Sequence, residues 1–147
     1  MISRSGIASL TSQTLESTKP HPMTYDPNNI FAQILRNDLP CKKVYEDDYI
    51  LAFHDINPQA PIHILILPKG TYVSMDDFTM NASDSEICAL WRGIGTIARS
   101  LGVVEGGYRL LANHGKDAHQ EVPHLHIHLF AGKPLGPMLT KPTIAHE

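Results

Sequence analysis

Cysteine is scarce in this sequence of 147 residues, which contains only Cys41 and Cys88. Two cysteines without a metal-binding spacing form neither a disulfide framework nor a cysteine-rich zinc site, so we expect two reduced thiols. Long apolar segments are also missing. The longest aliphatic run is the one from Ile64 to Leu67, which is far short of the ~20 residues that span a bilayer. We therefore expect a soluble, cytoplasmic protein that does not contact a membrane.

Positive charge is not in excess either. The chain has 12 Lys and Arg against 15 Asp and Glu, which gives a formal net charge of −3. Proteins that bind nucleic acid duplexes derive much of their affinity from a basic surface. We therefore expect no nucleic-acid partner, although a single nucleotide is compatible with this charge.

Four common motifs of phosphate binding and hydrolysis are absent. The sequence has no GxxxxGK[ST] loop, no GxGxxG after a strand, no GxSxG turn and no HExxH helix. If the protein handles a phosphate, imidazoles and backbone amides must hold it.

The length suits one domain with a core that needs no disulfide or metal for stability. The first 24 residues hold nine Ser and Thr but only three charged side chains, Arg4, Glu16 and Lys19. They contain no secretory signal pattern. We expect residues 1–25 to form a disordered extension, with Met23 as an alternative start, and residues 26–147 to form the domain.

Hydrophobic periodicity predicts an α+β fold with a mainly antiparallel five-stranded sheet and two helices. Ser83 and Glu86 are spaced as a capping box at the start of the longer helix. The broad apolar stripe of this helix is also a candidate subunit interface. The predicted helices cover 29–38 and 83–101, and the predicted strands cover 43–46, 49–55, 62–67, 108–113 and 125–130.

The stretch HLHIHLF at 124–130 places three histidines at alternate positions, with an aliphatic residue between each pair. Alternate side chains of a strand point to opposite faces, so we expect the imidazoles to line a surface while the aliphatic residues pack in the core. Neighbouring imidazoles disfavour one another's protonation, so some stay neutral at pH 7. A neutral imidazole is a nucleophile or a base, and a protonated neighbour donates to an anion. This pattern suits attack on an anionic phosphorus centre by His124, His126 and His128.

The sequence pattern is also compatible with two other interpretations of the three histidines. The first is a hydrated strand face without a function. The second is a zinc site with an open fourth position. Positions i and i+2 of a strand are ~6.6–6.8 Å apart, so one flat strand rarely brings three nitrogens to one ion. We therefore expect no metal and no other cofactor.

The pattern at 124–130 resembles the histidine triad family of nucleotide hydrolases and transferases. The likeness extends over about residues 26–140. It includes IFAQILRNDLPCKKVYEDDYILAFHDINPQAPIHILILPK at 30–69, the QEV before the triad, and HLHIHLFAGKPLGPML at 124–139. These motifs are similar to the nucleotide-binding, HINT-like branch in its bacterial form. The resemblance implies a homodimer that hydrolyses purine nucleoside phosphoramidates and binds purine nucleotides.

The resemblance also implies a role for each matched residue. His126 is the expected nucleophile that carries a transient nucleotidyl group, and His124 and His128 flank it on the phosphate. His63 is expected to assist through hydrogen bonds in the imidazole cluster, and Asp55 to accept both ribose hydroxyls. The remaining expected contacts are Ile56 against the nucleoside, Ile30, Phe31 and Ile34 around the purine, and Asn113, Gln120, Glu121 and Val122 on the phosphate side.

Two positions depart from the family pattern. His119 stands where many relatives have glycine, so we expect a strained backbone there. Glu121 stands where some relatives have serine near the leaving group, which leaves the leaving-group preference open. Two other functions also stay open: a dinucleoside polyphosphate hydrolase or nucleotidyl transferase of the same superfamily, and a non-catalytic purine-nucleotide-binding partner protein. The sequence GKPLGPML at 132–139 favours the HINT-like branch.

Overall fold

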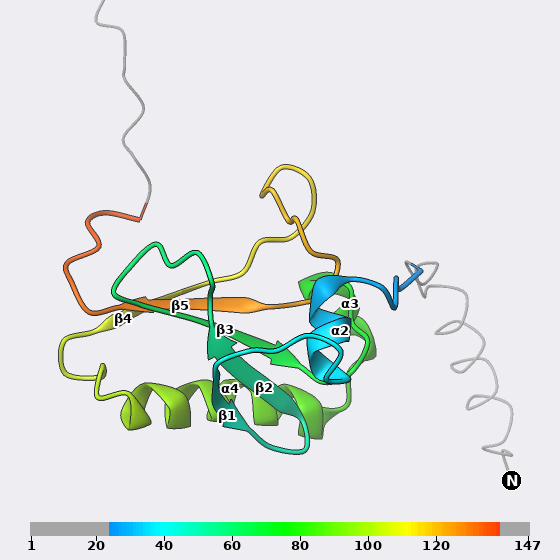
Figure 1. Cartoon of the computed structure of the whole chain (residues 1–147), viewed down its shortest axis with the longest axis horizontal. Helices are drawn as coiled ribbons and strands as arrows, with labels where there is room; N and C mark the ends of the chain where they lie inside the picture. The colour runs from blue at the N-terminus through cyan, green and yellow to red at the C-terminus, as the bar shows by residue number, and fades with distance from the viewer. Residues whose placement is uncertain (1–23, 139–147) are drawn as a thin grey trace, which may run out of the picture.

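The computed structural model describes residues 24–138, and its centre is one antiparallel sheet (Figure 1). The five strands follow the order β1-β2-β3-β5-β4. Their bounds are β1 Lys43–Glu46, β2 Ile50–His54, β3 Ile62–Pro68, β4 Tyr108–Leu111 and β5 Ile127–Ala131. The helices are α2 Ile30–Leu35, α3 Met75–Asn81 and α4 Asp84–Ser100. The predicted α+β fold with a five-stranded antiparallel sheet is confirmed.

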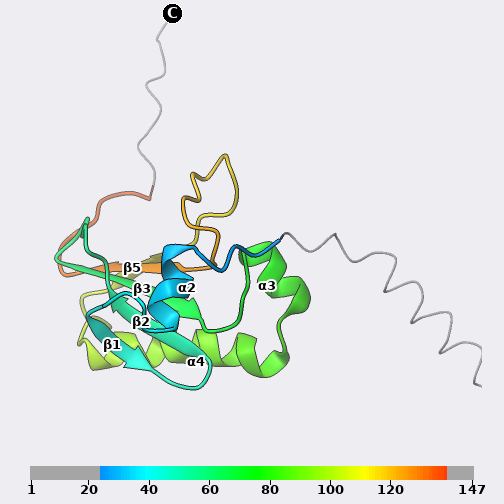
Figure 2. The same ribbon diagram turned by 45° about the vertical axis from the view of Figure 1, so that its right-hand side comes forward.

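Both faces of the sheet are covered, because α4 lies along one face and α2 along the other (Figure 2). Ile64 and Ile66 of β3 pack toward Leu90 and Ile94 of α4. The alternate β3 residues Leu65 and Leu67 pack with Phe31 of α2 on the opposite face. The period of two along each strand thus supplies two apolar clusters, one for each helix.

The long helix α4 begins where the sequence predicts. The Ser83 side chain accepts from the Glu86 backbone N–H, and the Glu86 carboxylate accepts from the Ser83 backbone N–H, which completes the capping box. Buried Leu90, Ile94 and Ile97 face the sheet. None of the helices in the described part of the chain is long and apolar enough to cross a membrane.

Two helical features differ from the prediction. The short helix α3 is an addition to the two expected helices, and Ser74 caps its start while Phe78 is its buried residue. A seven-residue helix with one buried residue has no apolar periodicity to detect. Helix α2 ends at Leu35 rather than at residue 38, because Asn37 takes a positive φ of 66° that ends the helix.

Strand β5 begins at Ile127, two residues after the predicted start. Before it, the Leu125 N–H donates to the Tyr72 carbonyl, which lies outside the sheet. The side chains still alternate. Leu125, Ile127 and Leu129 are buried in the cluster against α4, so the triad histidines lie on the face that carries α2.

The predicted extension, residues 1–25, falls mostly on residues 1–23, which lie outside the described residues. Tyr25 is described, and it is half-buried against the domain. The folded unit therefore begins before residue 26.

Candidate active site

Two of the three triad histidines are buried and His128 is half-buried, in contrast to the prediction that the histidine face lines a surface. His124 has no exposed area and His126 is 8% exposed. The Phe31 ring of α2 packs edge-on against the His126 ring, with the centroids 4.8 Å apart. Burial of these rings beneath α2 removes water from them and so favours their neutral forms.

The hydrogen bonds of His126 determine which of its nitrogens is free. Its Nδ1 lies 2.7 Å from the backbone oxygen of His124. A carbonyl only accepts, so Nδ1 carries the proton and donates it. In the neutral ring the lone pair is therefore on Nε2, which is the nitrogen available for attack.

His128 has the opposite arrangement because of its contact with His63. The backbone N–H of Gln59 donates to His63 Nδ1 over 3.1 Å, so the proton of neutral His63 is on Nε2. That Nε2 lies 2.9 Å from His128 Nδ1 and donates to it. His128 consequently carries its proton on Nε2. Among the described residues, this buried atom has no hydrogen-bond partner.

The two adjacent triad rings thus offer complementary groups. The His126 and His128 centroids are 5.1 Å apart. His126 presents a lone pair, and His128 presents an N–H that is buried and unpaired. A buried unpaired donor costs stability, and an anionic oxygen placed beside it would relieve that cost.

The Asp55 carboxylate lies at the edge of this imidazole cluster. Its Oδ2 is 3.5 Å from His63 Nε2, and its Oδ1 accepts from the Asn57 N–H over 2.8 Å. The carboxylate is half-buried, so it remains accessible to a ligand. Its negative charge also acts on the histidines, because it raises the pKa of His126 and of His128 and so partly opposes burial.

Burial is the main cause of the pKa shifts in the cluster. It lowers the pKa of His124 to about 4, and for His128 burial and then the nearby His126 and His63 lower the pKa to about 4. Burial also lowers the pKa of His126 and of His63 below the ordinary 6.5. The imidazoles are therefore neutral at pH 7 in the free protein, whereas the sequence predicts this for only some of them and from mutual repulsion rather than from burial.

The residues expected around the nucleoside lie along two adjoining cavities. Asp55, Ile56 and His63 line a cavity of about 670 Å³, where the Ile56 side chain is 88% exposed. Ile34 lines a cavity of about 730 Å³ between α2 and β1. Both cavities include Pro40 and Cys41. Of the remaining apolar pair, Ile30 is exposed and Phe31 is buried against His126.

The residues expected on the phosphate side have separate environments. Asn113 lines a cavity of about 460 Å³ together with Phe130, whose ring packs on His63 and His128. Val122 packs in the apolar cluster of Phe31. Gln120 donates to the backbone oxygens of Val73 and Val122 and accepts from the Gly115 N–H. Its side chain thus holds its own loop together and joins it to Val73.

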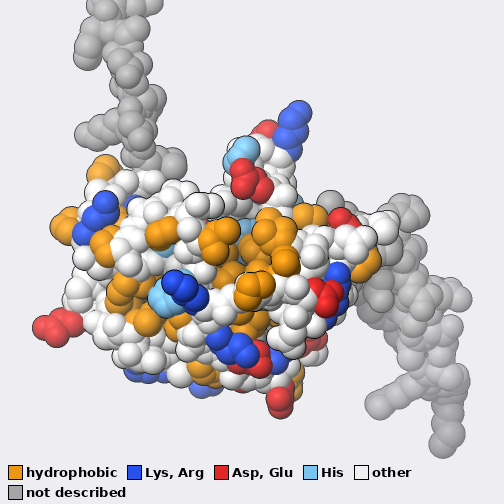
Figure 3. All heavy atoms as spheres, in the orientation of Figure 1, with side chains coloured by type: hydrophobic (Ala, Val, Ile, Leu, Met, Phe, Trp, Pro, Cys, Tyr) orange, Lys and Arg blue, Asp and Glu red, His pale blue; other side chains and the backbone are white. Residues whose placement is uncertain are grey.

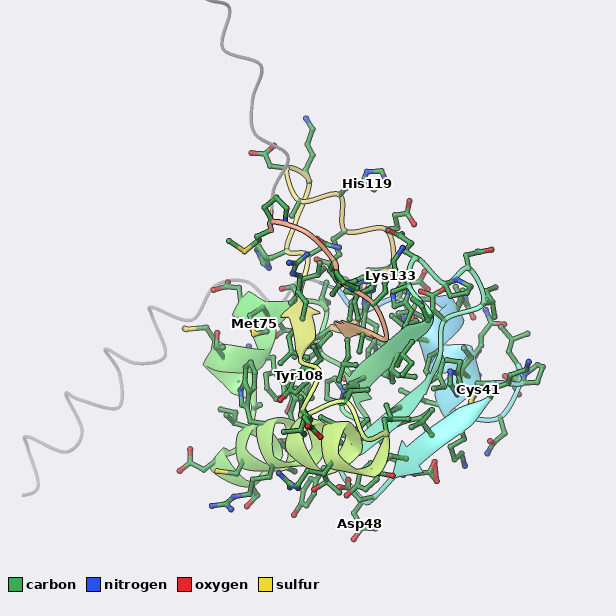
Figure 4. The ribbon with its side chains drawn as sticks, turned by 90° about the vertical axis from the view of Figure 1, so that its left-hand side faces the viewer. Cys41, Asp48, Met75, Tyr108, His119 and Lys133 are labelled. Carbon is green, nitrogen blue, oxygen red and sulfur yellow. The ribbon has the colours of Figure 1, made fainter. Side chains whose placement is uncertain are left out.

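His119 lies on the loop that projects beyond the sheet (Figure 4), and its side chain pairs with that of Glu121. Their Nε2 and Oε1 atoms are 2.8 Å apart, and the side chains are 85% and 75% exposed. His119 has a φ of 59°, so the predicted strain at a position that suits glycine is confirmed. Charged and histidine side chains gather on this projecting loop (Figure 3). Within residues 24–138, no hydrogen bond or ion pair joins the pair to the imidazole cluster.

The metal interpretation of the triad does not fit the geometry. Both nitrogens of His124 are engaged, with the Pro68 oxygen and with the Tyr25 hydroxyl, so the three triad rings cannot share one ion. In the described part of the chain, Asp55, His63 and His128 bring ligand atoms within 4.8 Å of one another. Within this group, His63 Nε2 and His128 Nδ1 already share a hydrogen bond of 2.9 Å.

Three contributors to the site have no signal in the sequence pattern. They are the Tyr25 hydroxyl, the Gln59 backbone N–H and the Pro68 backbone oxygen. The last two are main-chain groups, so no side-chain pattern in the sequence marks them. Tyr25 precedes the first predicted element, and only its three-dimensional contact with His124 distinguishes it.

Comparisons with known proteins agree with this geometry. Residues 36–135 match the HIT domain. An uncharacterized 13.2 kDa HIT-like protein of Azospirillum brasilense is 64% identical over 118 residues, which cover 80% of this chain and 97% of that protein. The purine nucleoside phosphoramidase of Escherichia coli K12 is 44% identical over 113 residues, which cover 75% of this chain and 92% of that enzyme.

Among solved structures, a HIT family hydrolase from Clostridium thermocellum superimposes with a TM-score of 0.70 at 38% identity. The superposition covers 77% of this chain and 97% of the hydrolase. The likeness thus extends over nearly the full length of each of these three relatives.

Proposed function

Because the chain belongs to the HIT domain family, we propose that it hydrolyses purine nucleoside phosphoramidates through a nucleotidyl group carried on His126. The E. coli relative named a purine nucleoside phosphoramidase supports the substrate class. The observation that carries the proposal is the complementary protonation of two adjacent rings, a lone pair on His126 Nε2 beside an unpaired N–H on His128 Nε2.

In the first step, His126 Nε2 attacks the α-phosphorus and the P–N bond breaks. The phosphate oxygens gain negative charge in the transition state, and the His128 Nε2–H donates to one of them. The preorganised donor matters because the site is buried, where a hydrogen bond to an anion is stronger than in water.

The leaving nitrogen must take up one proton to depart as a neutral amine. The His63 and His128 pair, which is neutral in the free protein, takes up one proton when the anionic substrate binds, because the phosphate charge and the Asp55 carboxylate 3.5 Å from His63 favour its protonated form. The pair then passes this proton to the leaving nitrogen. In the second step, water attacks the phosphorus, the His126–phosphorus bond breaks and the nucleoside monophosphate leaves. The proton released from water returns to the pair, so the cycle balances.

The nucleoside would occupy the groove between α2 and the loop after β2. A half-buried carboxylate suits the two hydroxyls of a ribose, and Asp55 lines the cavity beside His63. The apolar side chains of the adjoining cavity suit a purine ring. Under this proposal, Asp55 binds the ribose and Ile56, Ile30, Phe31 and Ile34 contact the nucleoside, while Asn113, Gln120, Glu121 and Val122 border the phosphate side.

The experiment that tests the function is a substrate panel in the presence of EDTA. Adenosine 5′-phosphoramidate, its guanosine counterpart and a diadenosine polyphosphate are supplied to the full chain at equal concentration. We expect turnover of the phosphoramidates to exceed that of the polyphosphate. Faster polyphosphate cleavage would instead identify a dinucleoside polyphosphate hydrolase. Binding of the monophosphate without turnover of any compound would identify a binding protein.

The same panel tests whether a metal takes part. The proposed steps use imidazoles alone, so we expect equal rates with and without EDTA. Loss of activity in EDTA, restored by zinc, would assign the reaction to a metal held by Asp55, His63 and His128.

A further inference from the structure

Tyr25 contacts the triad from outside the segment that matches the HIT domain. Its hydroxyl lies 2.5 Å from His124 Nδ1, and the two rings meet edge to face with centroids 5.6 Å apart. The other nitrogen of His124, Nε2, lies 2.8 Å from the Pro68 carbonyl oxygen. The carbonyl can only accept, so His124 Nε2 carries the proton and Nδ1 accepts from the Tyr25 hydroxyl.

The direction of this hydrogen bond is stable around neutral pH. Burial raises the pKa of the Tyr25 hydroxyl, so the hydroxyl keeps its proton. Burial, and to a lesser extent a charge on His126, lower the pKa of His124 to about 4, so His124 stays neutral. Arg36 and Asp26, the charged groups that face Tyr25, act on its pKa in opposite directions.

The segment that holds Tyr25 is fastened to α2 and is not a loose end. Immediately after Tyr25, the chain makes a turn whose backbone is held by side chains of the turn itself and of α2. The contacts are Asn28 N to Asp26 Oδ1, 2.8 Å; Asn29 Nδ2 to the Asp26 oxygen, 2.7 Å; Gln33 Nε2 to the Asn28 oxygen, 2.7 Å; and Arg36 Nη1 to the Pro27 oxygen, 2.5 Å. A donor on such a support is held in place before substrate arrives.

His124 passes this restraint to His126 through its backbone. The His124 carbonyl accepts from His126 Nδ1 over 2.7 Å, which is the bond that leaves the His126 lone pair on Nε2. Tyr25 and Pro68 together hold both nitrogens of the His124 ring, so the ring cannot flip or change its tautomer without losing a buried hydrogen bond. Because its ring is held at both nitrogens, His124 as a whole is restrained, and so is the carbonyl that accepts from His126.

We propose that Tyr25 is a positioning residue for the reaction at His126: its hydroxyl holds His124, whose carbonyl holds the His126 imidazole in the nucleophilic tautomer. This inference rests on the proposed function for its kinetic consequence. Its structural content, the tautomers of His124 and His126, is independent of any substrate.

The test compares Tyr25→Phe with a matched control, Tyr45→Phe, in the full chain. Tyr25→Phe keeps the aromatic ring and removes only the hydroxyl. Tyr45 is a half-buried tyrosine of β1, at the far edge of the sheet, whose hydroxyl donates to Asp47 Oδ2 over 3.0 Å. Each variant therefore loses one hydroxyl and one hydrogen bond, but only Tyr25→Phe loses a bond to the triad.

Two measurements are made on each protein. Two-bond ¹H–¹⁵N correlation spectra of the histidine side chains report the tautomers of His124 and His126. Steady-state kinetics with adenosine 5′-phosphoramidate separate kcat from KM. For Tyr25→Phe we expect a second tautomer at His126, while the Pro68 carbonyl still holds the His124 proton on Nε2. We also expect a kcat lower by about 3–10-fold, the range that corresponds to one ordinary hydrogen bond, at an unchanged KM. For Tyr45→Phe we expect wild-type spectra and kinetics.

The proposal is overturned if His126 keeps its wild-type tautomer in Tyr25→Phe, or if kcat falls no further than in Tyr45→Phe. A change confined to His124 also overturns it, because Tyr25 would then restrain His124 alone. If the wild-type protein turns over no phosphoramidate, the proposed function fails, and the His126 spectrum alone decides the role of Tyr25.

Discussion

His63 Nε2 lies 2.9 Å from His128 Nδ1, and the Gln59 backbone N–H on the far side of His63 fixes the direction of that hydrogen bond. The proton must run from His63 to His128, because a backbone N–H can only donate. His63 therefore determines that His128 presents its own proton, on Nε2, to the site. Without His63, neutral His128 could adopt either tautomer.

The first prediction concerns this orientation. His63→Leu removes the donor to His128 Nδ1 while keeping an apolar side chain under Phe130, so His128 would present its Nε2 proton only part of the time. We expect kcat to fall by about 10–100-fold, by analogy with the groups that orient metal-binding histidines. His114→Leu, which replaces an exposed histidine, is the control. A His63→Leu enzyme with wild-type kcat would show that His63 does not orient His128.

The second prediction concerns the pH dependence of kcat/KM. Burial lowers the pKa of His126 below 6.5, so the nucleophile is protonated, and activity is lost, only below that pH. The alkaline limb comes from the substrate complex and is therefore read from kcat: there the His63 and His128 pair loses the proton that it takes up with the substrate, so the kcat profile is bell-shaped. The Asp55 charge raises the pKa of His126, so Asp55→Asn is expected to move the acid limb to lower pH. A profile that is flat from about pH 5 to 9 contradicts the division of roles among the histidines.

The third prediction concerns stability in acid. The pKa of His124 is about 4 in the folded chain and about 6.5 in the unfolded chain. Between these values the unfolded chain binds a proton that the folded chain excludes, so the free energy of unfolding falls as pH drops from 6.5 to 4. For His124 alone, the free energy of unfolding falls by about 3 kcal/mol over this pH range.

Urea denaturation at both ends of this range measures the loss. His124→Asn should flatten the dependence on pH, although it also lowers stability at pH 7, and His114→Asn should leave the dependence as in the wild type. If His124→Asn keeps the wild-type slope, His124 is not the buried neutral histidine that the geometry indicates.

The fourth prediction concerns the homodimer, which the family resemblance implies and which we retain as a proposal. Trp91 of α4 is 51% exposed, and β4 is an edge strand with Leu111 exposed. Light scattering should give the mass of two chains for the wild type and a shift toward one chain for Trp91→Glu. Thr96→Glu, at an exposed position on another side of α4, is the control. A wild type of monomeric mass would refute the dimer.

Side-chain periodicity is sufficient to predict the sheet and to predict which side chains of residues 124–130 face the core. Leu125, Ile127 and Leu129 are buried against α4 as their spacing indicates, because a strand with one apolar face has only one favourable register. The capping box at Ser83 and Glu86 is likewise a local pattern with a local cause. These features depend on residues that are close together in the sequence.

The site's finer organisation could not be predicted in this way. The tautomers of His126 and His128 depend on the His124 carbonyl and the Gln59 N–H, and backbone groups leave no residue-specific signal. Gln120 was expected on the phosphate side, but its amide is used to hold the loop from Gly115 to Val122. Burial of the histidine face follows from the position of Phe31, which is far away in the sequence.

The measurement that tests the central claim most directly is intact-mass analysis of a rapidly quenched reaction with adenosine 5′-phosphoramidate in EDTA. We predict that the wild-type chain gains the mass of one adenylyl group within a turnover. His126→Ala should gain none and should lose turnover, while His114→Ala should behave as the wild type. Turnover without an adduct, or an adduct that persists in His126→Ala, would contradict nucleophilic attack by His126.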